Sequence, residues 1–82
     1  MKKIIITPQA RVDVRRIDRE TAMRILTSLD RFARTGEGDV KRLQDIEPPE
    51  FRLRVGDYRV RYYDHGISIL VLSVLHRSEA YR

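Results

Sequence analysis

The stretch that decides the fold is LRVGDYRVRYY, residues 53–63, in which apolar and basic residues alternate on both sides of Gly56-Asp57. A glycine followed by aspartate suits a two-residue hairpin of the type II′ class, where glycine takes the first central position. Successive side chains of a strand point to opposite faces, so the hairpin is predicted to carry its arginines on one face and its apolar residues on the other. The turn gives the cross-strand pairs Val55–Tyr58, Arg54–Arg59, Leu53–Val60 and Arg52–Arg61.

The residues before the hairpin predict one strand and two helices. Residues 2–7 contain three consecutive β-branched isoleucines, which favour a strand. Thr7-Pro8 supplies an N-cap and a first helical position, and this helix is expected to end near Ile17. Asp18 caps a second helix, in which apolar residues recur every three or four positions. Gly36 is expected to end that helix in the left-handed conformation.

The remainder completes an α+β fold of order βααβββ. Residues 36–50 are predicted as a connector, because Pro48-Pro49 fits neither a helix interior nor a central strand. Residues 64–66 form a second turn, and the apolar run at 67–75 is typical of an interior strand. We therefore expect one domain, residues 1–82, with two N-terminal helices packed on a mainly antiparallel four-stranded sheet.

The composition limits which partners and which kinds of site the protein can have. The 82 residues carry 17 Lys+Arg against 12 Asp+Glu, a formal charge of +5, which favours anionic partners such as nucleic acid. The absence of cysteine excludes disulfides and thiolate metal sites, and no metal-ligand spacing or glycine-rich phosphate loop is present. We expect no metal and no cofactor. The N-terminus is too short in apolar residues for a signal peptide or membrane span, and a cytoplasmic location is expected.

The four arginines of the hairpin are the main functional signal. Like charges directly opposite each other destabilise a sheet by a few tenths to about 1 kcal/mol per pair, unless an anion binds between them. The alternative is an ordinary solvated strand whose long side chains splay apart. Arg77 favours the first interpretation, because it follows the last long strand and would reach the same surface together with His76 and Tyr81. Arginines offer bidentate donors to phosphate oxygens, and a tyrosine ring offers a plane for a base.

At these residues the chain resembles the RelE/ParE superfamily of type II toxin–antitoxin toxins. The resemblance covers nearly the whole chain and is densest in LRVGDYRVRYY and SVLHRSEAYR, with GDVKRLQ before the hairpin and AMRILTSLDRFA in the second helix. RelE-like members are endoribonucleases (mRNA interferases) that cut mRNA in the ribosomal A site and so inhibit translation. They use no metal: the ribose 2′-OH attacks the adjacent phosphate. ParE-like members lack the RelE residue set and poison DNA gyrase.

The resemblance implies a role for each basic position. Arg59 and Arg77 would stabilise the charge that grows on the phosphate, and Arg77 would also assist the leaving oxygen. Tyr81 would stack on or orient the nucleotide. Arg54 stands where the best-studied pattern has a lysine proposed as general base; arginine stays protonated, so water or His76 is left to share that role. The remaining candidates for RNA binding are Arg52, Arg61 and His76.

Partners follow from the same resemblance. The RelE-like interpretation implies a ribosome with A-site mRNA as the target, and a cognate antitoxin whose acidic or amphipathic segment covers the toxin in a higher-order hetero-oligomer. Because the chain ends one residue after Tyr81, the C-terminal helix of longer relatives is expected to be missing. Two other functions remain open: a ParE-type gyrase poison, and a non-catalytic module that binds an antitoxin or nucleic acid.

Overall fold

The central hairpin has the predicted register. In the computed structural model, which describes residues 1–80, β3 (Phe51–Val55) pairs antiparallel with β4 (Tyr58–Asp64), and Arg54 lies opposite Arg59. Gly56 has φ 58°, whereas Asp57 keeps an ordinary negative φ, as a type II′ turn requires. The alternation read from the sequence therefore fixes which face of the sheet each side chain takes.

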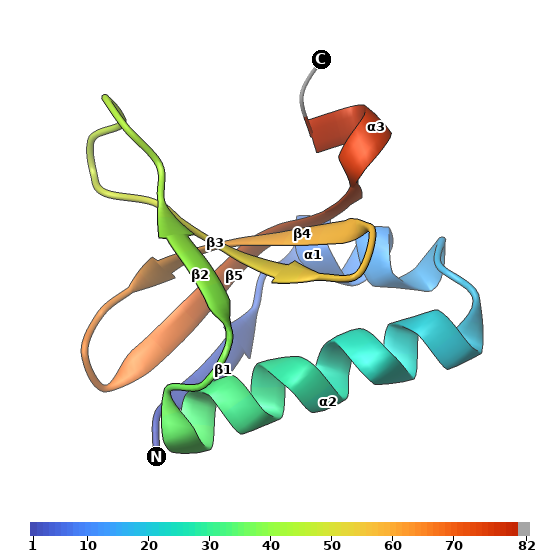
Figure 1. Cartoon of the computed structure of the whole chain (residues 1–82), viewed down its shortest axis with the longest axis horizontal. Coiled ribbons are helices and arrows are strands. Elements are labelled where there is room, and N and C mark those ends of the chain that lie inside the picture. Colours follow the sequence, from blue (N-terminus) through green and yellow to red (C-terminus); the bar gives the residue numbers. More distant parts are fainter. Residues whose placement is uncertain (81–82) are drawn as a thin grey trace.

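The sheet has the order β1-β5-β4-β3-β2 (Figure 1). The last strand, β5 (Ser68–His76), lies between β4, with which it is antiparallel, and β1 (Lys3–Ile6), with which it is parallel. A register shift between Arg61 and Tyr62 in the β4–β5 ladder marks a bulge. Strand β5 is buried by neighbours on both edges, in agreement with its apolar sequence.

The expectation of four strands is wrong, because the predicted connector contains a fifth. Strand β2 (Asp39–Arg42) pairs antiparallel with β3 at the edge of the sheet. All four of its side chains are exposed, so it lacks the apolar alternation that would reveal a strand in the sequence. Just before β2, Gly38 lets the backbone pass close to the Leu53 side chain, since a Cβ at this position would lie only 2.7 Å from Leu53 Cδ1.

Both helices begin where predicted. The Thr7 side chain accepts a hydrogen bond from the Ala10 amide at the start of α1 (Pro8–Arg15), and the Asp18 side chain does the same for Thr21 in α2 (Arg19–Thr35). Gly36 ends α2 with φ 77° in the left-handed region.

The helices cover one face of the sheet and bury an apolar core there. Tyr62 is fully buried, with its ring 5.6 Å from both Phe32 of α2 and Phe51 of β3. The other buried apolar residues are Ala10, Ile25, Leu29, Ala33, Leu53, Val55, Val60, Ile69, Val71 and Val74. Burial of this set supplies most of the favourable free energy of folding.

Helix α1 also completes the hydrogen bonding of β5 where β1 stops. Strand β1 pairs with β5 only as far as Val71. Beyond it, the buried Asp13 carboxylate accepts from the Val74 amide (3.0 Å) and from the Gln9 side chain (2.9 Å), while the Thr7 hydroxyl donates to the Val71 carbonyl (2.7 Å). These bonds satisfy backbone groups that would otherwise be buried without a partner.

The chain continues past β5 in a short helix, α3 (Arg77–Ala80), which projects from the top of the sheet in Figure 1. This helix precedes Tyr81, and the helix that longer relatives carry beyond that tyrosine is the one expected to be missing. Among residues 1–80, no helix is long and apolar enough to cross a membrane.

Candidate nucleic-acid interface

The face of the sheet opposite α1 and α2, here called the open face, carries two transverse rows of side chains. The register places one row as Lys41, Arg52, Arg61 and Ser73, and the other as Asp39, Arg54, Arg59 and Leu75. All four predicted arginines thus share the open face. The sequence interpretation missed Lys41, because its strand was taken for a connector.

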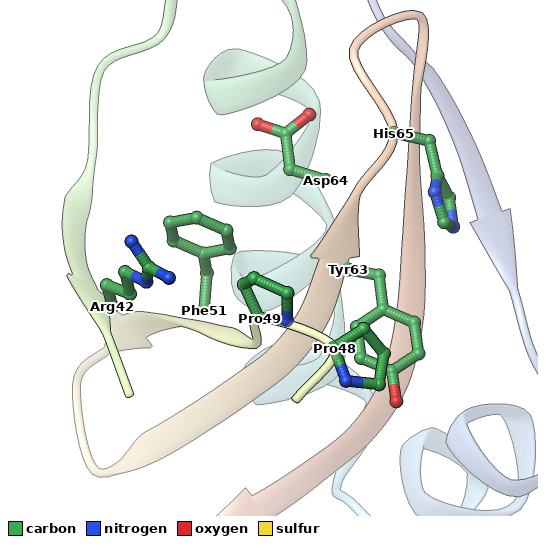
Figure 2. Close-up of a pocket in the computed structure, with 7 residues that line it drawn as sticks. All are labelled: Arg42, Pro48, Pro49, Phe51, Tyr63, Asp64 and His65. Carbon is green, nitrogen blue, oxygen red and sulfur yellow. The ribbon is translucent and has the colours of Figure 1, made fainter. Parts of the chain in front are cut away.

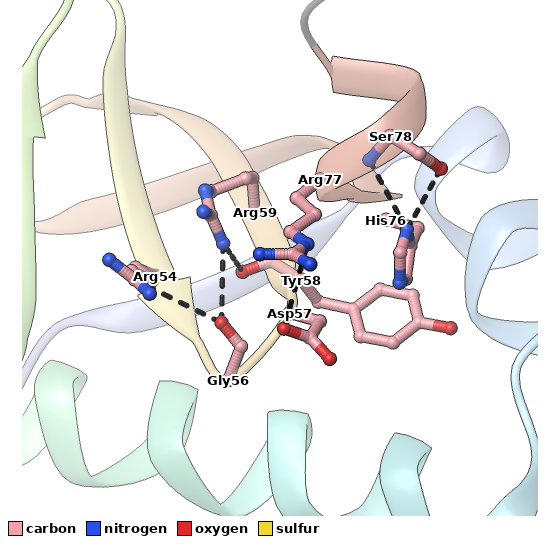
Figure 3. Close-up of polar contacts among 8 residues, drawn as sticks. All are labelled: Arg54, Gly56, Asp57, Tyr58, Arg59, His76, Arg77 and Ser78. Carbon is pink, nitrogen blue, oxygen red and sulfur yellow. Dashed lines mark hydrogen bonds and ion pairs between the residues drawn. The ribbon is translucent and has the colours of Figure 1, made fainter.

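Three arginines gather at the turn end of the open face, around Gly56 and Asp57 (Figure 3). Arg59 Nη1 donates to the carbonyls of Gly56 and Tyr58, each at 3.2 Å, and Arg54 Nε lies 3.5 Å from the same Gly56 oxygen. Arg59 is only 6% exposed, so its guanidinium is oriented by the fold before any ligand arrives. Arg54 is exposed beside it.

Arg77 joins this cluster from the end of β5. Its amide donates to the Asp57 carbonyl (2.7 Å), and its Nε lies 3.9 Å from Asp57 Oδ1. The side chain remains 63% exposed, which makes the ion pair weak and replaceable by a stronger anion. Arg54, Arg59 and Arg77, called the turn cluster below, therefore present guanidinium groups from three different strand ends.

A carboxylate that the sequence interpretation left in the connector lies on the same face. Glu50 is 7% exposed and accepts from Arg61 Nε (3.0 Å) and from Arg61 Nη2. Arg61 is therefore already neutralised by a protein anion. Counting the open face and its turn within the described residues, six cations (Lys41, Arg52, Arg54, Arg59, Arg61, Arg77) face three acids (Asp39, Glu50, Asp57), a net of +3.

His76 lies apart from the turn cluster. It pairs with Tyr58, and its ring contacts the Tyr58 ring edge-on at 5.3 Å on the side where Asp13 and Ile17 lie. Its Nδ1 accepts from the Ser78 amide (3.2 Å) and lies 2.9 Å from the Ser78 hydroxyl. A neutral His76 therefore carries its proton on Nε2. The structure thus does not bring His76 together with the predicted arginines.

The other predicted residues have simpler positions. Arg52 is half-buried in the first row, between Lys41 and Arg61. Tyr81 lies outside the described residues. No group of three His, Asp or Glu side chains that could hold a metal ion occurs within residues 1–80.

Two pKa shifts mark the far end of β4, away from the turn cluster. A hydrogen bond from Lys2 lowers the pKa of the Asp64 carboxyl below its ordinary value. Burial raises the pKa of the Tyr62 hydroxyl to about 12. Both groups keep their usual charge at neutral pH and act in the fold.

Three solved toxin–antitoxin structures are similar to this chain. The RelB–RelE complex from Methanococcus jannaschii matches at 21% identity and a TM-score of 0.77, covering 94% of each chain. The RelE–RelB complex from Pyrococcus horikoshii OT3 matches at 22% identity and 0.75, covering 95% of this chain and 97% of that one. The RelBE2 complex from Mycobacterium tuberculosis matches at 26% identity and 0.58, covering 93% and 98%.

No curated protein sequence matches the chain. A family model does: residues 4–81 match the model described as the ParE toxin of the type II toxin–antitoxin system parDE. That match spans almost the whole chain, and the fold agrees with the RelE structures above. The chain therefore belongs to the ParE toxin family, within the RelE/ParE superfamily, and is a toxin of a type II toxin–antitoxin system.

Proposed function

We propose that this toxin is a ribosome-dependent endoribonuclease that cleaves mRNA in the A site and so inhibits translation, acting without a metal in the cytoplasm as one domain. The observation that carries the proposal is the turn cluster. Three guanidinium groups gather around the β3–β4 turn: Arg54 and Arg77 are exposed, and the nearly buried Arg59 is held in place by two carbonyl bonds. Preoriented donors of this kind suit an anion whose charge increases in the transition state.

The cluster suggests a division of roles in the cleavage. The ribose 2′-oxygen attacks the adjacent phosphorus, the P–O5′ bond breaks, and the products are a 2′,3′-cyclic phosphate and a 5′-hydroxyl. Arg59 and Arg54 stabilise the non-bridging oxygens, and the exposed Arg77 stabilises the leaving 5′-oxygen, which takes a proton from solvent. Tyr81 orients the nucleotide.

The proton of the 2′-OH goes to water in this proposal. Arg54 is always protonated and cannot accept it. His76 is engaged through Nδ1 with Ser78 and lies against Tyr58 on the other side of β4. The half-buried Arg52 and the exposed Lys41, which pair across β3 and β2, hold the RNA backbone through sequence-independent contacts.

A cognate antitoxin is the proposed protein partner, in a higher-order hetero-oligomer, because similar toxins are solved in complex with antitoxins. The net positive open face suits an acidic segment of that antitoxin. Hydrogen exchange of the complex should show protection of β3 and β4. A stable complex that left the arginines as open as in the free toxin would contradict neutralisation by masking.

The second candidate is a DNA gyrase poison, favoured by the description of the matching family model. It makes different predictions: inhibition of supercoiling, DNA damage rather than translation arrest, and little effect of replacing Tyr81.

Primer extension on an mRNA held in ribosomes with an empty A site tests the first candidate. The wild-type toxin should cut within the A-site codon, and the extension should stop at the new 5′-hydroxyl end of the downstream fragment. Arg77→Ala should lower the cleavage rate by about 10²- to 10³-fold, the effect of losing one transition-state donor. Arg24→Ala is the matched control, because it removes the same charge from an exposed position of α2. Wild-type-like cleavage by Arg77→Ala would remove Arg77 from the site, and absence of cleavage by the wild type would favour gyrase.

A further inference from the structure

A pocket of about 480 Å³ lies at the other end of β4 from the turn cluster (Figure 2). Its size falls in the range of small-molecule sites. Most of the lining comes from rings: two prolines of the loop before β3, and aromatic side chains of β3, β4 and the turn after β4. The lining residues are Arg42, Pro48, Pro49, Phe51, Tyr63, Asp64 and His65.

The loop that walls this pocket is tied to the sheet at both ends. The Leu43 amide donates to the Glu50 carbonyl (2.9 Å), which closes the loop between β2 and β3. The Glu50 carboxylate then binds Arg61 on the open face. Pro48 and Pro49 are therefore held beside β4 by contacts that need no ligand, and the pocket is preformed.

The pocket meets the arginine rows at Tyr63, whereas Arg42 and Phe51 reach it from the other face of the sheet. Tyr63 is two residues beyond Arg61 and four beyond Arg59 on β4, so these side chains share the open face. At about 3.3 Å per residue, Tyr63 lies roughly 13 Å along the strand from Arg59. An RNA strand with a phosphate at the turn cluster can cover that distance within a few nucleotides.

The chemistry of the lining suits a nucleobase. Tyr63 and His65 contact each other edge-on (centroids 6.1 Å apart), and with the proline rings they offer flat surfaces on which an unstacked base can rest. Arg42 is exposed at the pocket and can pair with a phosphate. The one carboxylate of the lining, Asp64, is already bound by Lys2 and by the Gly66 amide, so it repels an incoming phosphate less.

We propose that this pocket binds one unstacked nucleobase of the RNA, a few nucleotides from the phosphate held at the turn cluster. The inference rests on the proposed RNA-cleaving function and adds a base-binding subsite to it. An apolar side chain of an antitoxin is the competing occupant. The nucleobase is favoured because Tyr63 connects the pocket to the cationic open face and because Arg42 lies at the edge of the pocket.

The test is an abasic scan of RNA binding. The ligands are single-stranded RNAs of about ten nucleotides, with 2′-O-methyl riboses that prevent cleavage. Each RNA of the series has an abasic site at a different position, and fluorescence anisotropy measures the Kd of its complex with the whole toxin. In the wild type, base removal at one position should weaken binding on the order of tenfold, the effect of one lost base–aromatic stack. Tyr63→Ala should weaken intact RNA by a similar factor and abolish the sensitivity to that position.

Three variants make the scan specific. Tyr63→Phe keeps the ring and should behave as the wild type. Tyr63→Leu keeps apolar bulk without a flat ring, so it should lose the sensitivity even if Tyr63→Ala folds poorly. Ile67→Ala, 86% exposed and outside the pocket lining, should change nothing.

The outcomes separate this inference from the proposed nuclease. A positional sensitivity that survives in Tyr63→Leu, or no sensitive position in the wild type, overturns the pocket assignment while A-site cleavage still stands on its own assay. A Tyr63-dependent sensitivity in a toxin that cleaves no A-site mRNA supports the pocket and overturns the nuclease. Weakening of the antitoxin complex by Tyr63→Leu, with an unchanged scan, overturns the nucleobase and assigns the pocket to the antitoxin.

Discussion

The two faces of the sheet around the β3–β4 hairpin differ in what their side chains contribute: one face stabilises the fold, and the other carries the cations. On the face against the helices, the register aligns Val40, Leu53, Val60 and Val74 across four strands, and the last three are buried. One residue along each strand, the open face aligns Asp39, Arg54, Arg59 and Leu75. The covered row stabilises the fold through burial, while the open row holds cations whose mutual repulsion lowers stability. Mutation should therefore change the stability of the fold much more at a covered residue than at its neighbour on the open face.

The largest expected contrast is between Leu53 and Arg54. Leu53→Ala removes a side chain that is 2% exposed in the core, and should lower the free energy of unfolding by about 2–5 kcal/mol. Arg54→Ala, at the next residue, should change the free energy of unfolding by no more than about 0.5 kcal/mol, because the side chain is exposed and its removal relieves the repulsion with Arg59. Urea denaturation of both variants measures this, and equal losses would refute the division between faces.

A smaller contrast exists within the open face, between the partners of its ion pair. Arg61→Gln leaves the Glu50 carboxylate, whose side chain is 9% exposed, without its cation and should cost about 1–3 kcal/mol. Glu50→Gln leaves Arg61, which water can still reach, and should cost about 1 kcal/mol or less. Chemical denaturation of both single variants and of the double variant gives the coupling free energy between Glu50 and Arg61. Equal costs would show that burial of the carboxylate does not control the pair.

The smallest effect concerns the far end of β4. Because Lys2 lowers the pKa of Asp64 in the folded state, the pair stabilises the fold above the ordinary carboxyl pKa and loses this contribution as pH falls through the lowered value. Lys2→Met should cost about 0.2–1 kcal/mol near pH 7. This difference should begin to shrink as pH falls below the ordinary carboxyl pKa of about 4, and it should vanish once pH is below the lowered pKa of Asp64. Denaturation curves at several pH values measure the difference. A difference that persisted in acid would indicate packing by Lys2 rather than its charge.

The hairpin and the helix ends could be predicted because their signals are local. Alternation and the Gly56-Asp57 turn set the register, and Thr7, Asp18 and Gly36 have capping chemistry that depends on only a few neighbours. The gathering of Arg54, Arg59 and Arg77 followed from that register together with the pairing of β4 and β5.

The features that were missed depend on contacts between distant residues. Strand β2 forms through backbone bonds to β3 with four exposed side chains, so its sequence carries no alternation. Asp13 accepts from the Val74 amide beyond the end of β1, and nothing in the residues around it indicates a partner 61 positions along the chain. Glu50 is different: the register that pairs Arg52 with Arg61 also places Glu50 on the face of Arg61, and the contact was missed because Glu50 was assigned to the connector. The side to which His76 points likewise depends on the packing of its ring against Tyr58.

The position of β5 in the sheet has a consequence for synthesis. Strand β5, which lies inside the sheet between β1 and β4, is the last of the five to leave the ribosome. Strand β1, made first, pairs with β5 rather than with a strand made earlier. Until β5 emerges, the nascent chain can form its helices and the β3–β4 hairpin, but β1 lacks its partner and the core lacks Ile69, Val71 and Val74. Arg77 comes later still. A partly made toxin thus cannot assemble its arginine cluster before β5 and Arg77 have both been made.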